Sequence, residues 1–320
     1  MSNHEDNKNA IELITTVDGN HAKKISGSNS LYNQREVDVI NEEILEGYKQ
    51  LNIEMSSIGV VTPFLLQKEK IRQYVDTSIE VDTIHKFQGR AKSTMILSTV
   101  VNRYSDFIDD PLLINVAVSR AIDRFVLVAS PNLTKLHGTH IGDLSRYIFY
   151  QTKGDGVKES SIISIFDLLY KGREEDLIKK IMKYDKREEK SELLMLGVID
   201  DLLAIEELGH FDRRMHVSLS DIIPKNDFHL LTEEELLFVG RTGSHVDFVI
   251  FNKMDKVPVV FIEVDGFSNH ENNVVQTKRD ILKNEIFRKC NLRLIRFATN
   301  GSSEKDKLRS VLDEFCVTNK

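Results

Sequence analysis

Residues 115–130, NVAVSRAIDRFVLVAS, place an apolar helical pattern directly before a run rich in β-branched residues. Asp110 is suited to cap the N-terminus of this helix, and Pro111 fits its first turn. We therefore expect a helix that begins at Pro111 and reaches Arg124, followed by a strand in RFVLVAS. Upstream, the same alternation recurs, with apolar runs at 11–17, 57–64 and 94–101 and helical spacing of apolar residues at 37–48. This order predicts an α/β domain with a mostly parallel sheet over residues 1–150.

Length and composition favour two folded domains. Of the 320 residues 41% are hydrophobic and 29% charged, which excludes a collagen-like or wholly disordered protein. Two cysteines, Cys290 and Cys316, exclude a disulfide scaffold and favour a reducing compartment. The polar N-terminus lacks a signal-peptide core, and no apolar run approaches the ~18 residues that span a bilayer. We expect a cytoplasmic protein without membrane contact.

A charged segment separates the two expected domains. Fourteen of the twenty residues at 171–190 are charged, which predicts a solvated helical connector over 151–190. In the second domain, 191–320, we expect a helix at 192–205 and then a polar stretch. Two strands, HVDFVIFN and VPVVFIEVDGF, should follow as a hairpin, and after them a helix at 273–290 and the strand LRLIRFAT.

Three segments of the first domain carry a family resemblance. SIGVVTPFLLQKEKI at 57–71 resembles motif IV of superfamily 1 helicases, VDTIHKFQGRAKSTMILSTV at 81–100 resembles motif V, and residues 115–130 resemble motif VI. The second RecA-like domain of Upf-like helicases is similar over roughly residues 10–150. The resemblance implies a helicase C-terminal RecA-like domain.

The chemistry of these motifs assigns roles to six residues. Arg120 is a permanently charged fork suited to a transferring γ-phosphate, and Gln88 and Gly89 are expected beside the nucleotide. Thr83, His85 and Lys86 lie at a strand-to-helix type of turn, where they are expected to contact nucleic acid.

The motor is incomplete in this sequence. No GxxxxGK[ST] phosphate-binding loop occurs, Ala91 stands where the family commonly has an acid, and Leu65 stands where it often has an arginine. We expect ATP to be used only together with a Walker-A-bearing helicase domain, supplied by a partner or a longer parent chain. The chain alone should not turn over ATP.

The second domain resembles another family. The string HVDFVIFN, VPVVFIEVDGFSNH, QTKRDILK and LRLIRF is similar to the PD-(D/E)XK nucleases, particularly the branch allied to very-short-patch repair endonucleases. The likeness covers roughly residues 191–312. It implies a restriction-endonuclease-like α/β domain.

Phosphodiester hydrolysis needs a hard cation held by carboxylates. Asp247 and Glu263 lie on the two strands of the expected hairpin, and Glu263 and Asp265, two residues apart, share one face. We assign Asp247 and Glu263 to Mg²⁺ or Mn²⁺, with Asp265 and Glu192 as supporting groups; the role of Glu192 follows from the resemblance.

The orthodox motif has a lysine where this chain has Asp265, so another base or phosphate clamp is required. His270 is the expected base because its ordinary pKa lies near neutrality. Arg279 and Lys283, on one helix face, are expected to hold the scissile phosphate, with Arg296 as a weaker candidate. Cys290 falls on the apolar seam of the helix and is expected in the core, and the other histidines show no zinc-binding spacing.

The sequence leaves two interpretations open. The first is a DNA-processing protein with a helicase C-terminal domain and a metal-dependent nuclease-like domain, acting in DNA repair, recombination or phage defence, with RNA not excluded as a substrate. The second is a DNA-binding or assembly module in which both sites have decayed and which docks on a helicase partner. The net charge of −7 requires a local basic groove in either case.

Overall fold

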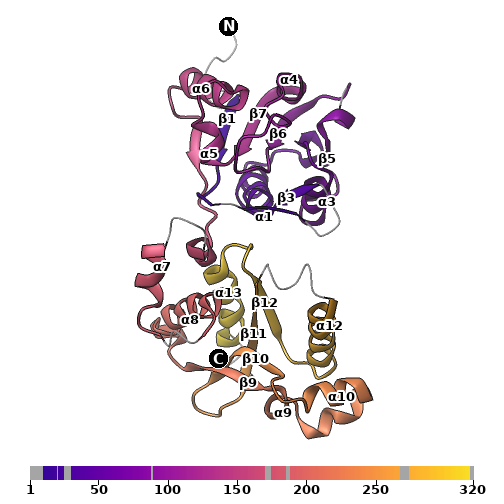
Figure 1. Cartoon of the computed structure of the whole chain (residues 1–320), viewed down its shortest axis with the longest axis vertical. Coiled ribbons are helices and arrows are strands. Elements are labelled where there is room, and N and C mark those ends of the chain that lie inside the picture. Colours follow the sequence, from indigo (N-terminus) through magenta and orange to yellow (C-terminus); the bar gives the residue numbers. More distant parts are fainter. Residues whose placement is uncertain are drawn as a thin grey trace. The chain divides into compact units, whose positions relative to one another are not determined.

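The computed structural model describes residues 10–19, 21–24, 30–87, 89–169, 174–184, 188–266 and 274–317. The chain divides into two compact units, Met1–Ile163 and Ser164–Lys320 (Figure 1). None of the helices formed by the described residues combines the length and apolar character needed to cross a membrane.

A six-stranded parallel sheet forms the centre of the first unit, which confirms the expected α/β class. Its strands follow the order β5-β4-β6-β7-β1-β8. The bounds are Ile11–Thr15 for β1, Ile58–Thr62 for β4, Glu80–Thr83 for β5, Lys92–Ser98 for β6, Ala121–Ala129 for β7 and Val157–Glu159 for β8. A separate two-stranded ribbon joins β2 (Ala22–Lys24) to β3 (Leu31–Asn33).

Helices cover both faces of this sheet. Alternate residues of one strand point to opposite faces, so Leu97 of β6 enters one apolar cluster and Ile96 the other. One cluster includes residues of α4 (Pro111–Ser119) and α6 (His140–Thr152), and the other includes residues of α1 (Gln34–Asp38), η1 (Val39–Leu45), α2 (Glu46–Gln50) and α3 (Leu65–Tyr74). The remaining short segments are η2 (Met55–Ser57), η3 (Ile84–Phe87) and α5 (Pro131–Thr134).

The helix-to-strand unit at 111–129 is confirmed at its start and wrong at its end. Asp110 caps α4 by accepting a hydrogen bond from the backbone of Leu112, and Pro111 is the first helical residue. The helix ends at Ser119 rather than at Arg124, and β7 begins at Ala121. Pairing of Ala121 with Lys92 of β6 extends the ladder into the residues whose spacing resembled a helix.

A buried carboxyl group stabilises the turn after β6. Glu36 accepts hydrogen bonds from Ser98 Oγ at 2.6 Å and from the backbone N–H of Val100 at 2.9 Å. Val100 has a φ of 72°, which is unfavourable for a β-branched residue. Burial raises the pKa of Glu36 to about 7, although its hydrogen bonds oppose the shift.

A four-stranded sheet of order β12-β11-β10-β9 forms the second unit. As expected, β10 (His245–Asn252) and β11 (Pro258–Asp265) are antiparallel. The last strand, β12 (Leu294–Ala298), pairs with β11 in parallel. The stretch expected to be only polar contains the edge strand β9 (Phe211–Ser218), antiparallel to β10. Charged residues are tolerated there because the outer side of an edge strand meets solvent.

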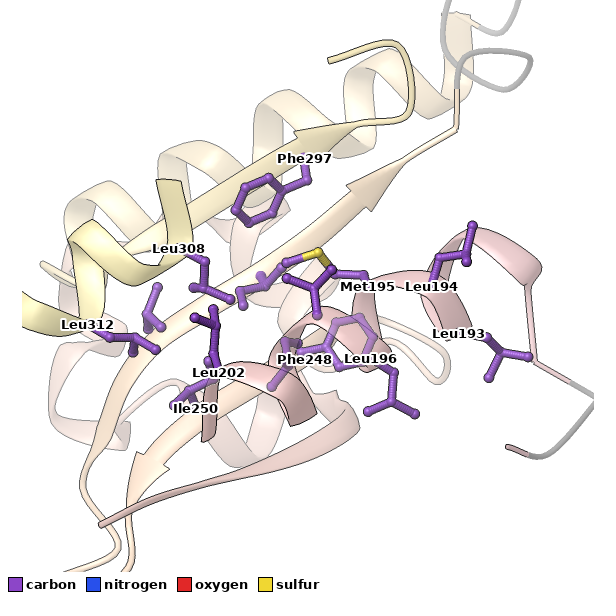
Figure 2. Close-up of a cluster of buried hydrophobic side chains, with 14 of the residues drawn as sticks. Leu193, Leu194, Met195, Leu196, Leu202, Phe248, Ile250, Phe297, Leu308 and Leu312 are labelled. Carbon is purple, nitrogen blue, oxygen red and sulfur yellow. The ribbon is translucent and has the colours of Figure 1, made fainter. Parts of the chain in front are cut away.

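Two apolar clusters hold the helices of this unit to its sheet. Figure 2 shows Phe248 and Ile250 of β10 beside Leu202 of α8 and Leu308 of α13 in one cluster. The other cluster buries Phe287 and Cys290, which confirms the core role expected for Cys290. The helices are α7 (Glu174–Ile181), α8 (Lys190–Leu203), α9 (Leu219–Ile222), α10 (Glu233–Val239), α12 (Val274–Lys289) and α13 (Glu304–Val317), with the short segments η4 (Ile165–Leu169), η5 (Glu206–Leu208) and η6 (Lys225–Leu230).

Candidate functional site

Asp247 and Glu263 lie on neighbouring strands of the second unit. Phe248 pairs with Ile262 in the antiparallel ladder, which places Asp247 opposite Glu263. Oδ2 of Asp247 accepts a 2.7 Å hydrogen bond from the backbone N–H of Val264, and Glu263 is buried. The hairpin therefore brings together the two carboxylates that the sequence assigned to a metal ion.

The ammonium group of Lys283 contacts Glu263 from helix α12. Its Nζ lies 2.7 Å from Glu263 Oε1 and donates a 2.8 Å hydrogen bond to the carbonyl oxygen of His245. The exposed fractions of the two side chains are only 12% for Lys283 and 8% for Glu263. One lysine thus compensates part of the charge of two adjacent acids.

The two acids hold protons more tightly than ordinary carboxyl groups. Burial raises the pKa of Asp247 to about 6 and that of Glu263 to about 7. The N–H of Val264 opposes the first shift and the charge of Lys283 opposes the second, whereas the charge of Asp247 adds to the shift of Glu263. A hard divalent cation would stabilise both charged forms, and carboxylate oxygens are the ligands that Mg²⁺ prefers.

Glu192 approaches the same acids from the first turn of α8. Its charge raises the pKa of Asp247, and its Oε2 lies 2.8 Å from His216 Nε2. The other ring nitrogen of His216, Nδ1, lies 3.6 Å from Glu188 Oε2. Strand β9 therefore adds an imidazole beside Glu192, and the charges of both side chains act on Asp247.

Asp265 forms a separate ion pair. Nη1 of Arg296 lies 2.6 Å from Asp265 Oδ1, and Nη2 of the same guanidinium lies 3.3 Å from Asp280 Oδ1. Arg296 also donates a 2.9 Å hydrogen bond to Asn284. Asp265 is thus bound by an arginine of the neighbouring strand, and Arg296 lies between two acids.

Two further residues of the expected nuclease site are Arg279 and His270. Arg279 is exposed on α12, and no hydrogen bond or ion pair within the described part of the chain joins it to Asp247 or Glu263. His270 lies outside the described residues.

Arg120 lies where β7 begins in the first unit. The residue caps the C-terminal end of α4, and its carbonyl oxygen accepts a hydrogen bond from the N–H of Lys92, the first residue of β6. Its Nε is buried without a partner, Nη2 donates to Ser119 Oγ at 3.3 Å, and no described carboxylate pairs with it. A guanidinium with unused donors is suited to an anionic oxygen such as that of a phosphate.

The other helicase-type residues lie along residues 83–89. Thr83 ends β5 at the carboxyl edge of the sheet, and His85 and Lys86 are exposed on η3. Gly89 has a φ of 81°, a backbone conformation that favours glycine. Gln88 lies outside the described residues.

Sequence reasoning missed Glu188 and His216. Glu188 was overlooked because it falls in the charged connector expected at 151–190, and His216 because it lies in the stretch taken as polar and shows no zinc-binding spacing. Two signals were available: Glu188 and Glu192 are four residues apart, and the apolar residues of FDRRMHVS fall at alternate positions.

The first unit is similar in sequence to known helicases. Residues 1–132 match the AAA domain family AAA_12, and residues 204–315 match a family described as a protein of unknown function, DUF2726. The chain is 31% identical over 109 residues to the DNA polymerase alpha-associated DNA helicase A of Saccharomyces cerevisiae, covering 32% of this chain and 16% of that protein.

Two further proteins are similar to this chain. The chain is 28% identical over 138 residues to a regulator of nonsense transcripts 1 homolog of Arabidopsis thaliana, covering 39% of this chain and 11% of that protein. It is 32% identical over 116 residues to an uncharacterized ATP-dependent helicase of Methanocaldococcus jannaschii, covering 35% of this chain and 17% of that protein. The matches span less than a fifth of each of these three relatives. The first unit therefore contains a RecA-like region related to those of superfamily 1 helicases.

Proposed function

We propose that the chain processes DNA, with a helicase-type RecA-like region joined to a metal-dependent nuclease-like unit. The observation that carries the nuclease part is the convergence of Asp247, Glu263 and Lys283 in the second unit. The buried carboxyl of Glu263 and the half-buried carboxyl of Asp247, both with raised pKa values and beside a lysine, form a chemical group suited to a cation and a phosphate.

Asp247 and Glu263 would hold Mg²⁺ or Mn²⁺. Such an ion, when bound, polarises the phosphate and lowers the pKa of a water molecule. Lys283 lies against Glu263 and is therefore within reach of a phosphate oxygen beside these acids. Lys283 on α12 would thus supply the positive charge that the nuclease motif takes from a lysine at the position of Asp265.

Cleavage of supercoiled and linear DNA in Mg²⁺ or Mn²⁺ tests this function. Asp247→Asn and Glu263→Gln should each abolish cleavage, because each removes a charged oxygen ligand. Glu235→Gln is the matched control, since Glu235 also pairs with a lysine, Lys289, at 2.7 Å but belongs to a helix cap. Equal cleavage by the unsubstituted chain and Glu263→Gln would refute the assignment. The same assay with RNA decides the nucleic-acid preference.

For the first unit we propose that Arg120 acts on the γ-phosphate of an ATP held by a second, Walker-A-bearing RecA-like domain. The support is the guanidinium whose Nε has no partner among the described residues, together with the lack of a phosphate-binding loop in the sequence. Nucleic acid would contact Thr83, His85 and Lys86.

A decayed assembly module is the second candidate. The observations in its favour are that Lys283 already compensates Glu263 and that Arg296 already compensates Asp265. A decayed module would bind DNA without cleaving it in any divalent metal, and Glu263→Gln would leave DNA binding unchanged.

A further inference from the structure

We propose that Glu188, Glu192 and His216 form a second cation site, which takes a divalent transition-metal ion such as Mn²⁺ or Zn²⁺. This site adjoins the pair formed by Asp247 and Glu263, since the charges of Glu192 and His216 act on Asp247, but it uses different ligand atoms. It does not depend on whether the second unit cleaves nucleic acid.

The three side chains already have the spacing of a coordination group. Each offers one ligand atom, and these atoms lie within 4.8 Å of one another. The shortest approach is 2.8 Å, between His216 Nε2 and Glu192 Oε2. Metal-to-ligand distances of about 2.0–2.2 Å place neighbouring ligand atoms roughly 3 Å apart, so binding requires only a small shift of the side chains.

The local charge favours a cation. Among the described residues, the carboxylates of Glu188 and Glu192 pair with no positive group other than His216. The charges of Glu188 and Glu189 act against ionisation of Glu192, which burial already disfavours, and Glu192 in turn acts on Asp247. The imidazole of His216 therefore faces three carboxyl groups, those of Glu192, Glu188 and Asp247, and a divalent ion would reduce their mutual repulsion.

The imidazole is held in place from several sides. His216 has a φ of 49°, and its ring stacks edge-on with that of His245 at 5.0 Å between centroids. The ring of His245 is in turn fixed by a 2.9 Å hydrogen bond between Nδ1 and the carbonyl oxygen of Gly243.

The donor set selects the class of metal. Imidazole nitrogen suits Zn²⁺ and Ni²⁺ and is also accepted by Mn²⁺, which otherwise favours oxygen, whereas Mg²⁺ and Ca²⁺ prefer oxygen ligands alone. The pair Asp247 and Glu263 offers only oxygen. The two sites should therefore differ in their preference for transition metals over Mg²⁺.

Pulsed electron paramagnetic resonance tests the proposal with Mn²⁺ alone as the probe. The full chain is stripped with a chelator, loaded with one equivalent of Mn²⁺ in excess Mg²⁺, and examined for modulation by an imidazole nitrogen. The modulation should be present in the unsubstituted chain and lost in His216→Asn. Asparagine is the chosen substitute because it tolerates a positive φ. His245→Gln is the matched control and should keep the signal.

The variants separate this site from the proposed nuclease site. Glu263→Gln should keep the nitrogen modulation even where it abolishes cleavage, and Glu188→Gln, which preserves the histidine, should weaken Mn²⁺ binding about tenfold or more. Absence of modulation in the unsubstituted chain, its persistence in His216→Asn, its loss in Glu263→Gln, or unchanged affinity in Glu188→Gln would each overturn the proposal.

Discussion

Lys283 of α12 lies 2.7 Å from Glu263 of β11, although the two residues come from different elements of the second unit. Helix α12 thus supplies a positive charge beside the strand in which Asp265 stands where the resemblance to PD-(D/E)XK nucleases would place a lysine. Asp265 itself is engaged by Arg296. The ion pair between Lys283 and Glu263 is therefore the contact on which the interpretation of this unit depends.

Lys283→Met should destabilise the metal-free chain at pH 8. Breaking a largely buried ion pair leaves the carboxylate of Glu263 uncompensated, at a cost of about 3 kcal/mol or more in the free energy of unfolding. The loss should be smaller at pH 5, where Asp247 and Glu263 are protonated. Urea unfolding at the two pH values measures both effects. Lys289→Met is the control: its partner Glu235 has a lowered pKa, so its loss should not shrink at pH 5.

The stability of the metal-free chain should fall as the pH rises from 4.5 to 8. The pKa of Glu263 is raised from 4.5 to about 7 on folding, so the folded state binds more protons in this range and loses that advantage as Glu263 ionises. Asp247 and Glu36 act in the same direction. Glu263→Gln and Glu36→Gln should each flatten the profile in unfolding measurements across this pH range. A profile that rises with pH would contradict these pKa directions.

Much of the fold could be predicted because its signals are local. Apolar runs gave the strands β1, β4, β6 and β7, and Asp110 with Pro111 gave the start of α4. The end of α4 and the edge strand β9 were missed, since both depend on pairing with a neighbouring strand that the local pattern does not specify.

The candidate site was predictable to the extent that it lies on one hairpin. Asp247 and Glu263 follow from two adjacent strands, whereas the contacts of Lys283 and His216 depend on how α12 and β9 pack against them. The pairing of Asp265 with Arg296 likewise arises between parallel strands that are distant in sequence. Tertiary packing therefore decided which charged residues became partners.

Arg120→Ala should leave thermal stability nearly unchanged, within about 0.5 kcal/mol, because no described carboxylate pairs with this side chain. Arg296→Ala is the contrasting variant and should destabilise the second unit, since it removes the partner of Asp265 and Asp280.

The unsubstituted chain alone should show negligible ATPase activity. Robust turnover that disappears in Arg120→Ala would contradict the need for a second RecA-like domain.

DNA affinity should be modest and should decrease steeply with salt, because an acidic chain can bind only through local lysines and arginines. Lys86 is exposed on η3, so Lys86→Ala should reduce the slope of log affinity against log salt concentration by about 1. Fluorescence anisotropy at several salt concentrations measures this slope. Affinity that does not change with salt would exclude phosphate contacts as the main source of binding.

Thermal melts with and without Mg²⁺ show whether Asp247 and Glu263 bind a hard divalent cation. Mg²⁺ at a hundredfold above its dissociation constant should stabilise the unsubstituted chain by about 2.7 kcal/mol and raise its melting temperature. Glu263→Gln should lose this response, whereas Glu235→Gln should keep it. An unchanged melting temperature of the unsubstituted chain in Mg²⁺, or an equal rise in Glu263→Gln, would contradict such binding.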